Sequence, residues 1–453
     1  MVVADEAEWR RLPGVIAVYR AAIAQAREEV DDARGYAQRA LDLAAPDDDL
    51  IRGSAAGFLA LAAWTSGDLE RGHRMYAECM RRILRIGYRS DALGCSIALA
   101  DIRIAQGRLS DAMRTYEGAL HLTAAQGEPP LRGTADMYVG MSELHLERND
   151  LQAATQLLSR SKELGELGGL PQNPYRWCVA MARIQEVEGD LDDAVDLLCE
   201  AERVYNGDLF PNVRPVAALK ARVWVRQGRV GQALDWVRGQ GLSVQDDLSY
   251  LHECEYITLA RVLLGLYRRD RADRSVHDAL ALLDRLLSAA ENDGRTGSAI
   301  EILVALALAH AAHGDTPAAL VSLERALTLA QSEGYVRMFV DEGPPMAALL
   351  RVAAARSIVP AYAGELLAAL QSQDSMGAGP THVSALQPLS EPLSQRERDV
   401  LRLFDSDLSG PDIARELVVA LSTVRTHTKS IYSKLGVTNR RAAVQRAADL
   451  QLI

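Results

Sequence analysis

Cysteine and aromatic residues are scarce in this chain of 453 residues. The cysteines are odd in number, scattered, and nowhere at the spacing of metal ligands (Cys79, Cys95, Cys178, Cys199 and Cys254). This pattern excludes a disulfide scaffold and predicts reduced thiols in a cytoplasm. Aromatic residues make up only 5% of the chain, while alanine and leucine dominate, which favours stacked helices over sheets.

Long hydrophobic runs are also missing. The longest apolar run, Ile302–Ala309, is far shorter than the ~20 residues needed to cross a membrane. The first residues, MVVADEAEWRR, lack the apolar core of a signal peptide. The sequence therefore predicts a soluble, cytoplasmic protein without a membrane partner.

Catalytic and metal-binding signatures are absent as well. The only lysines are Lys162, Lys220, Lys429 and Lys434, and none follows a glycine, so the chain has no Walker A loop for a nucleotide phosphate. His310 and His313 lie three residues apart, but no sequence motif supplies a third metal ligand. We therefore interpret them as a surface pair. No nucleophile motif or carboxylate pair stands out. We expect no enzymatic activity, no metal and no cofactor.

The last sixty-odd residues carry clear helix punctuation. Ser394 and Glu397 form a capping box ahead of an apolar stripe at helical spacing. Ser409 and Ser422 are N-caps of two further helices, separated by a turn at 418–421. A short helix, a tight turn and a capped helix with a basic face predict a helix-turn-helix. The expected helices span residues 394–406, 409–417, 422–435 and 440–450.

The charge distribution points to the same region. Residues 389–453 hold ten basic and eight acidic residues, a net charge of +2, and no acid lies between Ser422 and Arg446. Because the whole chain carries −11, residues 1–388 carry −13 and are repelled by phosphates. DNA contact is therefore expected at the C-terminus alone.

This region resembles the LuxR-type DNA-binding domain, in the form that ends MalT-like regulators. The resemblance rests on PLSQRERDVLRL, IARELVVALSTVRTHTKSIYSKLGV and NRRAAVQRAADL, in that order. Asp407, Gly410 and Thr428 depart from the usual pattern, but none belongs to the set that reads bases. The resemblance implies base contacts from Arg425, Thr426 and Lys429, phosphate contacts from Ser409, Ser422, Thr423, His427 and Lys434, and a dimer contact through Val444, Ala447 and Ala448.

Residues 1–345 contain a repeat with a period near forty residues. Its marker is a turn such as Gly67-Asp-Leu, which recurs at spacings of 40, 42, 40, 39, 46 and 40. A turn and two helical stretches per unit predict an α-solenoid of about eight helix pairs, the first beginning near Val30, and the pattern resembles tetratricopeptide (TPR) repeats. Five residues after most markers stands an alanine suited to close helix contact (Ala112, Ala194, Ala233, Ala279 and Ala319).

Three further features refine this organisation. The segment 334–343, GYVRMFVDEG, resembles the one that ends the solenoid of MalT-like regulators, and we expect a short extended piece there. Residues 346–371 predict a terminal helix pair, and 372–390, rich in Ser, Gly, Pro and Gln, a flexible linker before the DNA-binding domain at 391–453. Asp190, Asp192 and Asp193 fit a helix N-terminus better than a calcium loop.

The all-α chain is thus expected to be a sequence-specific, DNA-binding transcriptional regulator, an activator, associated with the nucleoid when bound. Its expected partners are double-stranded operator DNA, a second copy of the chain, RNA polymerase, and a small-molecule or protein effector in the concave face of the solenoid. Trp64, Trp177 and Trp224 either pack between repeats or line a ligand groove. The alternative function is an interaction scaffold with an idle DNA-binding module. MalT-like regulators usually begin with an ATPase, and the sequence leaves open whether the chain is naturally short or part of a longer protein.

Overall fold

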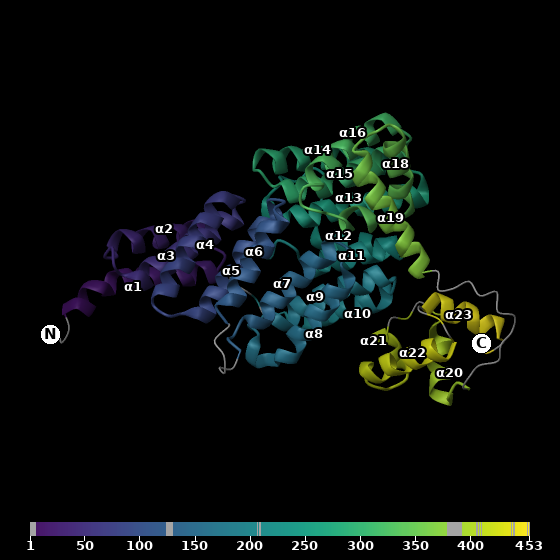
Figure 1. Ribbon diagram of the computed structural model, residues 1–453, viewed down its shortest axis with the longest axis horizontal. Coiled ribbons are helices and arrows are strands. Elements are labelled where there is room, and N and C mark those ends of the chain that lie inside the picture. The colour runs from purple at the N-terminus through teal and green to yellow at the C-terminus, as the bar shows by residue number, and fades with distance from the viewer. Residues whose placement is uncertain are drawn as a thin grey trace.

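The computed structural model describes residues 6–123, 130–205, 207, 210–377, 392–404, 406, 408, 410–435, 437, 440–450 and 452. Within these residues every regular element is a helix and none is a strand, which confirms the all-α fold. Figure 1 shows a long solenoid with a small separate domain beyond α10 at the C-terminal end of the chain.

The solenoid consists of antiparallel helix pairs that follow one another along the chain. The pairs α1–α2 to α15–α16 number eight in the described residues, as the repeat predicted, but the first pair begins at Glu6 with α1, and only its second helix, α2, begins at Val30. Their bounds are α1 Glu6–Ala26, α2 Val30–Leu43, α3 Asp49–Thr65, α4 Leu69–Arg85, α5 Arg89–Ala105, α6 Leu109–His121, α7 Thr134–Glu147, α8 Leu151–Gly168, α9 Asn173–Glu188, α10 Leu191–Val204, α11 Val216–Arg226, α12 Val230–Gln240, η1 Tyr250–His252, α13 Glu253–Asp270, α14 Asp273–Asn292, α15 Thr296–His313 and α16 Thr316–Ala330.

The repeat markers form the turns inside the helix pairs, except the one at Arg274, which lies within α14 while the turn of that pair is at Arg271. Gly67 and Gly314 adopt φ of +86° and +94°, a left-handed conformation that glycine tolerates best, and Asn149 adopts +65° in its place. The alanines that follow the markers are all fully buried (Ala112, Ala194, Ala233, Ala279 and Ala319). A left-handed turn and a buried alanine thus recur in most helix pairs, about once every forty residues.

The end of the solenoid differs from the prediction in two places. Segment 334–343 is not extended, because residues Arg337–Val340 form the short helix α17. The terminal pair is α18 (Pro344–Ala355) and α19 (Pro360–Gly377), so α19 continues past residue 371 and the expected linker start at 372 is wrong. The rest of that linker, 378–390, lies outside the described residues.

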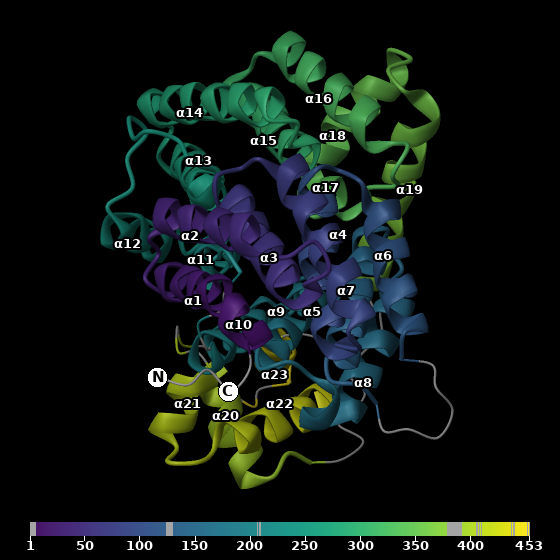
Figure 2. The same ribbon diagram turned by 90° about the vertical axis from the view of Figure 1, so that its left-hand side faces the viewer.

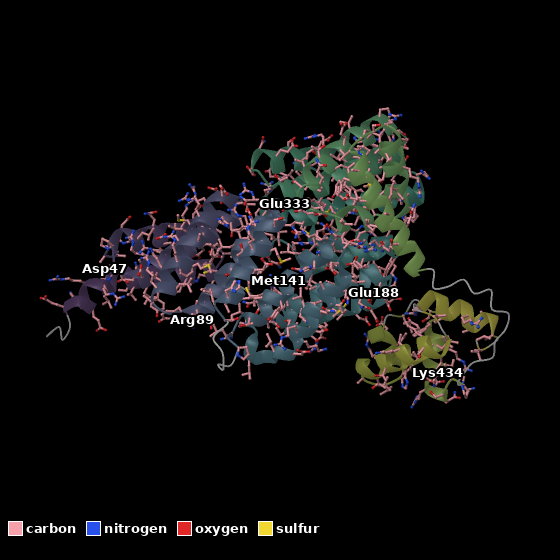
Figure 3. All side chains as sticks on the ribbon, in the orientation of Figure 1. Asp47, Arg89, Met141, Glu188, Glu333 and Lys434 are labelled. Carbon is pink, nitrogen blue, oxygen red and sulfur yellow. The ribbon has the colours of Figure 1, made fainter. Side chains whose placement is uncertain are left out.

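The solenoid closes on itself, so that early and late repeats touch. α15 contacts α5 and α17 contacts α7, and Figure 2 shows these late helices together with the early ones in a view along the solenoid. Figure 3 labels Glu333 in this region. Glu333 accepts a hydrogen bond from the backbone N–H of Ser110 at 2.8 Å. Buried Arg337 donates to Asn149 at 3.1 Å and pairs with Asp341. We call these contacts, together with those of Glu147 described below, the seam.

One helix at the seam is unusually apolar. α15 is long and apolar enough to cross a membrane by composition alone, and it is the one helix of that kind in the described part of the chain. Its residues 299–309 are nearly all buried in the main core, where α15 packs against α14 and α16. The apolar sequence is therefore accounted for by the core.

We expect Gly297→Ala to lower the melting temperature of the protein. A Cβ at this position would lie 2.4 Å from the carbonyl oxygen of Ile104, so α15 could no longer approach α5 as closely. Overpacking of this kind costs about 1–3 kcal/mol. Calorimetry of the variant measures the change, with Gly118→Ala in α6 as the matched control, because a Cβ there meets nothing within 4 Å. Equal melting temperatures for both variants would contradict the close contact.

The C-terminal domain has four short helices around its own core. They are α20 (Gln395–Phe404), α21 (Gly410–Glu416), α22 (Leu421–Leu435) and α23 (Arg440–Asp449), close to the predicted bounds. The core joins residues from all four helices, among them Val400, Ile413, Ile431 and Ala443. The domain therefore has a hydrophobic core independent of the solenoid.

Candidate nucleic-acid interface and solenoid cavity

The second and third helices of the C-terminal domain form a helix-turn-helix. α22 buries Val424, Ile431 and Leu435 against the other three helices. On its remaining surface Thr426 and Lys429 are exposed, as expected for residues that reach base edges. Arg425 lies beside them in the helix, although its side chain is outside the described part of the structure.

The five residues expected at phosphates fall into three groups. Thr423 and His427 are half-buried on α22, at the border of the exposed face. Lys434 forms a salt bridge to Glu397 at 2.9 Å, so its ammonium group is already paired within the domain. Ser422 is the second residue of α22, which begins at Leu421, so its predicted place as the N-cap is wrong, and its side chain is not described. Ser409 lies outside the described residues.

α23 was expected to supply the dimer contact. Val444 is half-buried and Ala448 is exposed, so both have surface available to a partner. Ala447 is fully buried together with Ala443, because this side of α23 packs into the domain core. The expectation that Ala447 contacts a second copy is therefore wrong.

Glu397 is the buried polar centre of the domain. Its carboxylate accepts hydrogen bonds from the Ser394 N–H at 2.6 Å, the Ser430 hydroxyl at 2.5 Å and Lys434 at 2.9 Å. Ser394 accepts in turn from the Glu397 N–H, which confirms the capping box. Burial alone would raise the pKa of Glu397, but the hydrogen bonds from Ser430, Lys434 and Ser394 outweigh it and lower the pKa to about 2.

Loss of this carboxylate should remove an acid-dependent part of the domain's stability. Because the folded pKa of Glu397 lies below its ordinary value of 4.5, its contribution is present above pH 4.5 and is lost as the pH falls towards 2. A shift of this size corresponds to about 3 kcal/mol. Urea unfolding of residues 391–453 at several pH values should show a steep acid loss in the native domain and a flatter profile in Glu397→Gln. Parallel profiles would contradict the assignment.

Arg440 has a structural role that the sequence did not reveal. Its guanidinium lies 5.2 Å from the centre of the Phe404 ring. It also donates to four backbone carbonyl oxygens at the end of α20 and in the turn that follows, at 2.7–2.9 Å (Leu403, Phe404, Ser406 and Leu408). Carbonyls at a helix end lack partners within the helix, so Arg440 caps α20. The sequence could not reveal this contact, because it depends on how α23 packs against α20 in the folded domain.

The DNA-binding domain rests against the solenoid at the start of α10. α21 contacts α10, and Arg440 lies 3.8 Å from the carboxylate of Asp192. Asp190 caps α10 by accepting from the Asp193 N–H at 3.4 Å, which confirms the N-terminal interpretation of these acids. Burial first, and then the charges of Asp190, Asp193 and Asp192, raise the pKa of Tyr432 on α22. Figure 3 shows Glu188, just before this acidic turn, on the side that faces the domain of Lys434.

The solenoid contains a cavity of about 300 Å³ between its helices. Residues of α3, α5, α6, α7, α9, α11, α13 and α15 line it, together with the segment 210–214 and Tyr335. The seam forms one side of the cavity. Trp64 belongs to the lining and donates from its indole N–H to the Tyr250 hydroxyl at 3.3 Å, but it is also buried in a hydrophobic cluster, so it fits both interpretations. Trp177 and Trp224 instead contact the hydrophobic clusters between repeats, as the packing interpretation predicted.

The cavity and the seam share a residue. Glu147 lines the cavity, accepts from Arg183 at 3.2 Å, and accepts from the backbone N–H of Met338 at 2.9 Å across the seam. The segment 334–343 is therefore the part of the chain that clasps the early repeats, and Tyr335 within it also faces the cavity. The resemblance to MalT-like regulators singled out this segment in the sequence, but the sequence did not predict its contact with Glu147.

A helical-repeat solenoid joined to a helix-turn-helix module defines a class of two-part DNA-binding proteins. The chain belongs to the family of the MalT-like TPR region, which matches residues 14–356. Residues 391–447 match the bacterial regulatory proteins of the luxR family. Both matches agree with the resemblance seen in the sequence, and the DNA-binding, TPR-like architecture is confirmed.

Relatives with known names are similar over most of the chain. The HTH-type transcriptional regulator MalT of Yersinia pestis (strain Pestoides F) is 28% identical over 407 residues, which cover 85% of this chain and 43% of the relative. MalT of Yersinia enterocolitica is 26% identical over 406 residues, with the same coverage. The chain thus spans less than half the length of these relatives. A signal transduction ATPase with a tetratricopeptide repeat sensor from Pyrococcus horikoshii matches 76% of this chain and 52% of its own, at 14% identity and a TM-score of 0.36.

Proposed function

We propose that the protein is a transcriptional regulator in which the C-terminal domain binds operator DNA and the solenoid receives the regulatory signal. The observation that carries this proposal is the exposed face of Thr426 and Lys429 on a helix-turn-helix that matches the luxR family. Phosphate contacts would supply most of the affinity, and the face that includes Arg425 would supply the specificity. A gel shift with promoter DNA and with random DNA of equal length tests it, and equal affinities would argue against sequence reading.

The proposal places the protein in the cytoplasm, associated with the nucleoid when bound to DNA. The proposal includes that the bound protein activates transcription through contact with RNA polymerase. Support comes from the named relatives, which are transcriptional regulators. Transcription in vitro from a promoter that contains the operator would show whether added protein raises or lowers the transcript level.

Two copies are expected to bind adjacent half-sites through α23. Val444 and Ala448 leave surface for close approach, and two-fold readers place half-sites about 10 bp apart. Val444→Arg should then weaken cooperative occupation of a two-half-site operator by about tenfold, because like charges would face each other across the pair. A footprint at increasing protein concentration measures this. An unchanged footprint, or native protection of one half-site at saturation, would contradict pairing through α23.

The docked arrangement supports a restraint on DNA binding. Asp190, Asp192 and Asp193 lie near the recognition helix α22, where they would repel a DNA backbone approaching the same face. Signal reception in the solenoid would then act by releasing the domain from α10. The seam residue Glu147 connects the cavity to segment 334–343, and Arg337 in that segment donates to Gln373 of α19, the helix that leads towards the DNA-binding domain.

One feature favours the alternative function, an interaction scaffold. α1 exposes large apolar side chains at alternating spacings of three and four residues (Trp9, Leu12, Ile16, Tyr19 and Ile23). This is the spacing of a coiled-coil seam, so the partner it fits is an amphipathic helix. The two functions differ in a gel shift with residues 391–453 on promoter DNA, since an idle module would not shift it.

A further inference from the structure

The cavity of the solenoid has the size and the walls of a site for a small molecule. Its volume of about 300 Å³ lies at the lower end of the range for such pockets. Aromatic rings from separate parts of the chain line it, including Trp64, Tyr175, Phe210 and Tyr250. Phe210 packs on Trp64 with ring centres 5.7 Å apart, so the segment before α11 reaches across to α3. The walls therefore suit a ligand with an apolar part.

Most charges around the cavity neutralise each other within the protein. Four carboxylates of its lining are bound to arginines: Asp101 to Arg176 at 3.6 Å, Glu147 to Arg183 at 3.2 Å, Glu253 to Arg295 at 2.8 Å and Glu301 to Arg222 at 2.6 Å. Each pair leaves little net charge for a ligand to meet. These residues build the walls and are not available as binding groups.

Two lining residues of opposite charge remain outside these pairs. Half-buried Glu143 of α7 and exposed Arg214, just before α11, make no hydrogen bond or salt bridge with the residues that the structure describes, although their charges act at longer range on Arg176 and Glu301. They act on the same neighbours: Tyr175 is held at a pKa of about 12, first by burial, while Glu143 raises that pKa and Arg214 lowers it. Both also influence the pKa of Asp101. One carboxylate and one guanidinium therefore flank the same part of the cavity.

A ligand with a single charge would satisfy only one of these groups. Half-buried Glu143 would lose water without gaining a partner, which is costly, whereas exposed Arg214 keeps part of its water. A guanidinium binds a carboxylate through two parallel hydrogen bonds, and a carboxylate beside aromatic faces suits an ammonium group.

We propose that the solenoid cavity binds a small zwitterion with an apolar side chain, an α-amino acid or a short linear peptide, whose carboxylate lies on Arg214 and whose ammonium lies on Glu143. This inference deepens the proposed function, because it rests on the solenoid as the receiver of the signal. The aromatic walls hold the side chain, and the paired charges around them remain as they are.

The test uses the full chain and a panel of defined probes: the standard protein amino acids, dipeptides of apolar residues, and the N-acetyl and carboxamide derivative of each. Isothermal titration should show binding by at least one free zwitterion, and blocking either of its ends should weaken binding at least tenfold. Glu143→Gln should weaken the zwitterion but not its N-acetyl derivative. Arg214→Gln should weaken the zwitterion but not its carboxamide, and Arg214→Lys should restore part of the affinity.

Matched controls keep the test independent of folding and of DNA binding. Glu365→Gln and Arg356→Gln remove the same charges at exposed positions outside the cavity lining, and they should bind the zwitterion like the native chain. The inference is overturned if no zwitterion of the panel binds, if blocked and free probes bind equally, or if the control variants lose as much affinity as the cavity variants. Failure of the proposed function would appear separately, as loss of operator preference in the gel shift without any probe.

Discussion

Replacing Arg425 with alanine is expected to weaken binding to the cognate operator by about 1–3 kcal/mol and binding to random DNA by much less. An arginine at this position of a recognition helix can donate two hydrogen bonds to the O6 and N7 atoms of guanine, which a phosphate contact cannot replace. The neighbouring exposed residues Thr426 and Lys429 show that this part of α22 faces away from the domain core. Fluorescence anisotropy with both DNAs at one fixed salt concentration measures the difference.

The matched control for this prediction is Arg398→Ala. Arg398 carries the same charge on α20, but it lies outside the recognition helix. It should reduce the affinity for both DNAs to a similar, small extent, because it contributes only to the general attraction of phosphates. If Arg425→Ala lowers both affinities equally, Arg425 contacts phosphate alone and the base-reading assignment is wrong.

Removing the solenoid should raise the affinity of the DNA-binding domain for its operator at low salt by about tenfold or more. In the structure the acidic start of α10 contacts the domain through Asp192 and Arg440 and lies near Tyr432 of the recognition helix. Residues 1–388 also carry a net charge of −13, which opposes the approach of DNA. Because such repulsion is screened, the gain should shrink as the salt concentration rises.

A smaller change separates local docking from the overall charge. The variant Asp190→Asn, Asp192→Asn, Asp193→Asn removes the acids at the contact, while asparagine at 190 can still cap α10. The control, Asp273→Asn, Asp278→Asn, Asp284→Asn, removes the same charge from α14, which lies on the opposite side of the solenoid from the domain in Figure 1. Only the first variant should reproduce the gain in affinity. Equal affinities of full and truncated chains at every salt concentration would instead show that the solenoid does not restrain the domain.

The sequence predicted the local features of this fold well, because they depend on neighbouring residues. The capping box of Ser394 and Glu397 and the repeat turns at residues such as Gly67 are short-range patterns with a known geometry. The four C-terminal helices followed from the same kind of signal, whereas the sequence placed the first repeat near Val30 and missed α1 at Glu6–Ala26. Whether Arg425 reads bases stays a prediction, since its side chain is not described.

The features that the sequence did not predict depend on distant parts of the chain. The bond between Arg337 and Asn149 joins residues 188 positions apart, and Arg440 reaches carbonyls more than thirty residues earlier. No periodicity encodes such contacts. For the same reason Ala447 looked like a partner contact, although the side of α23 on which it lies is the side that the domain core covers. Glu143 and Arg214 were also missed, because only the folded superhelix brings α7 close to the segment before α11.

The seam also has a consequence for the order in which the protein folds. An open array of repeats can nucleate anywhere and fray from its ends, because each repeat contacts only its neighbours. Here the repeats around Ser110 and Asn149 complete their contacts only with Glu333 and Arg337. During synthesis the surface of these repeats therefore stays uncovered until a further 188 residues follow Asn149 and 223 follow Ser110, and loop closure over such lengths slows the final step. Once closed, the repeats between Ser110 and Arg337 are expected to unfold together, whereas α1, which packs mainly against α2 and α3, can still fray.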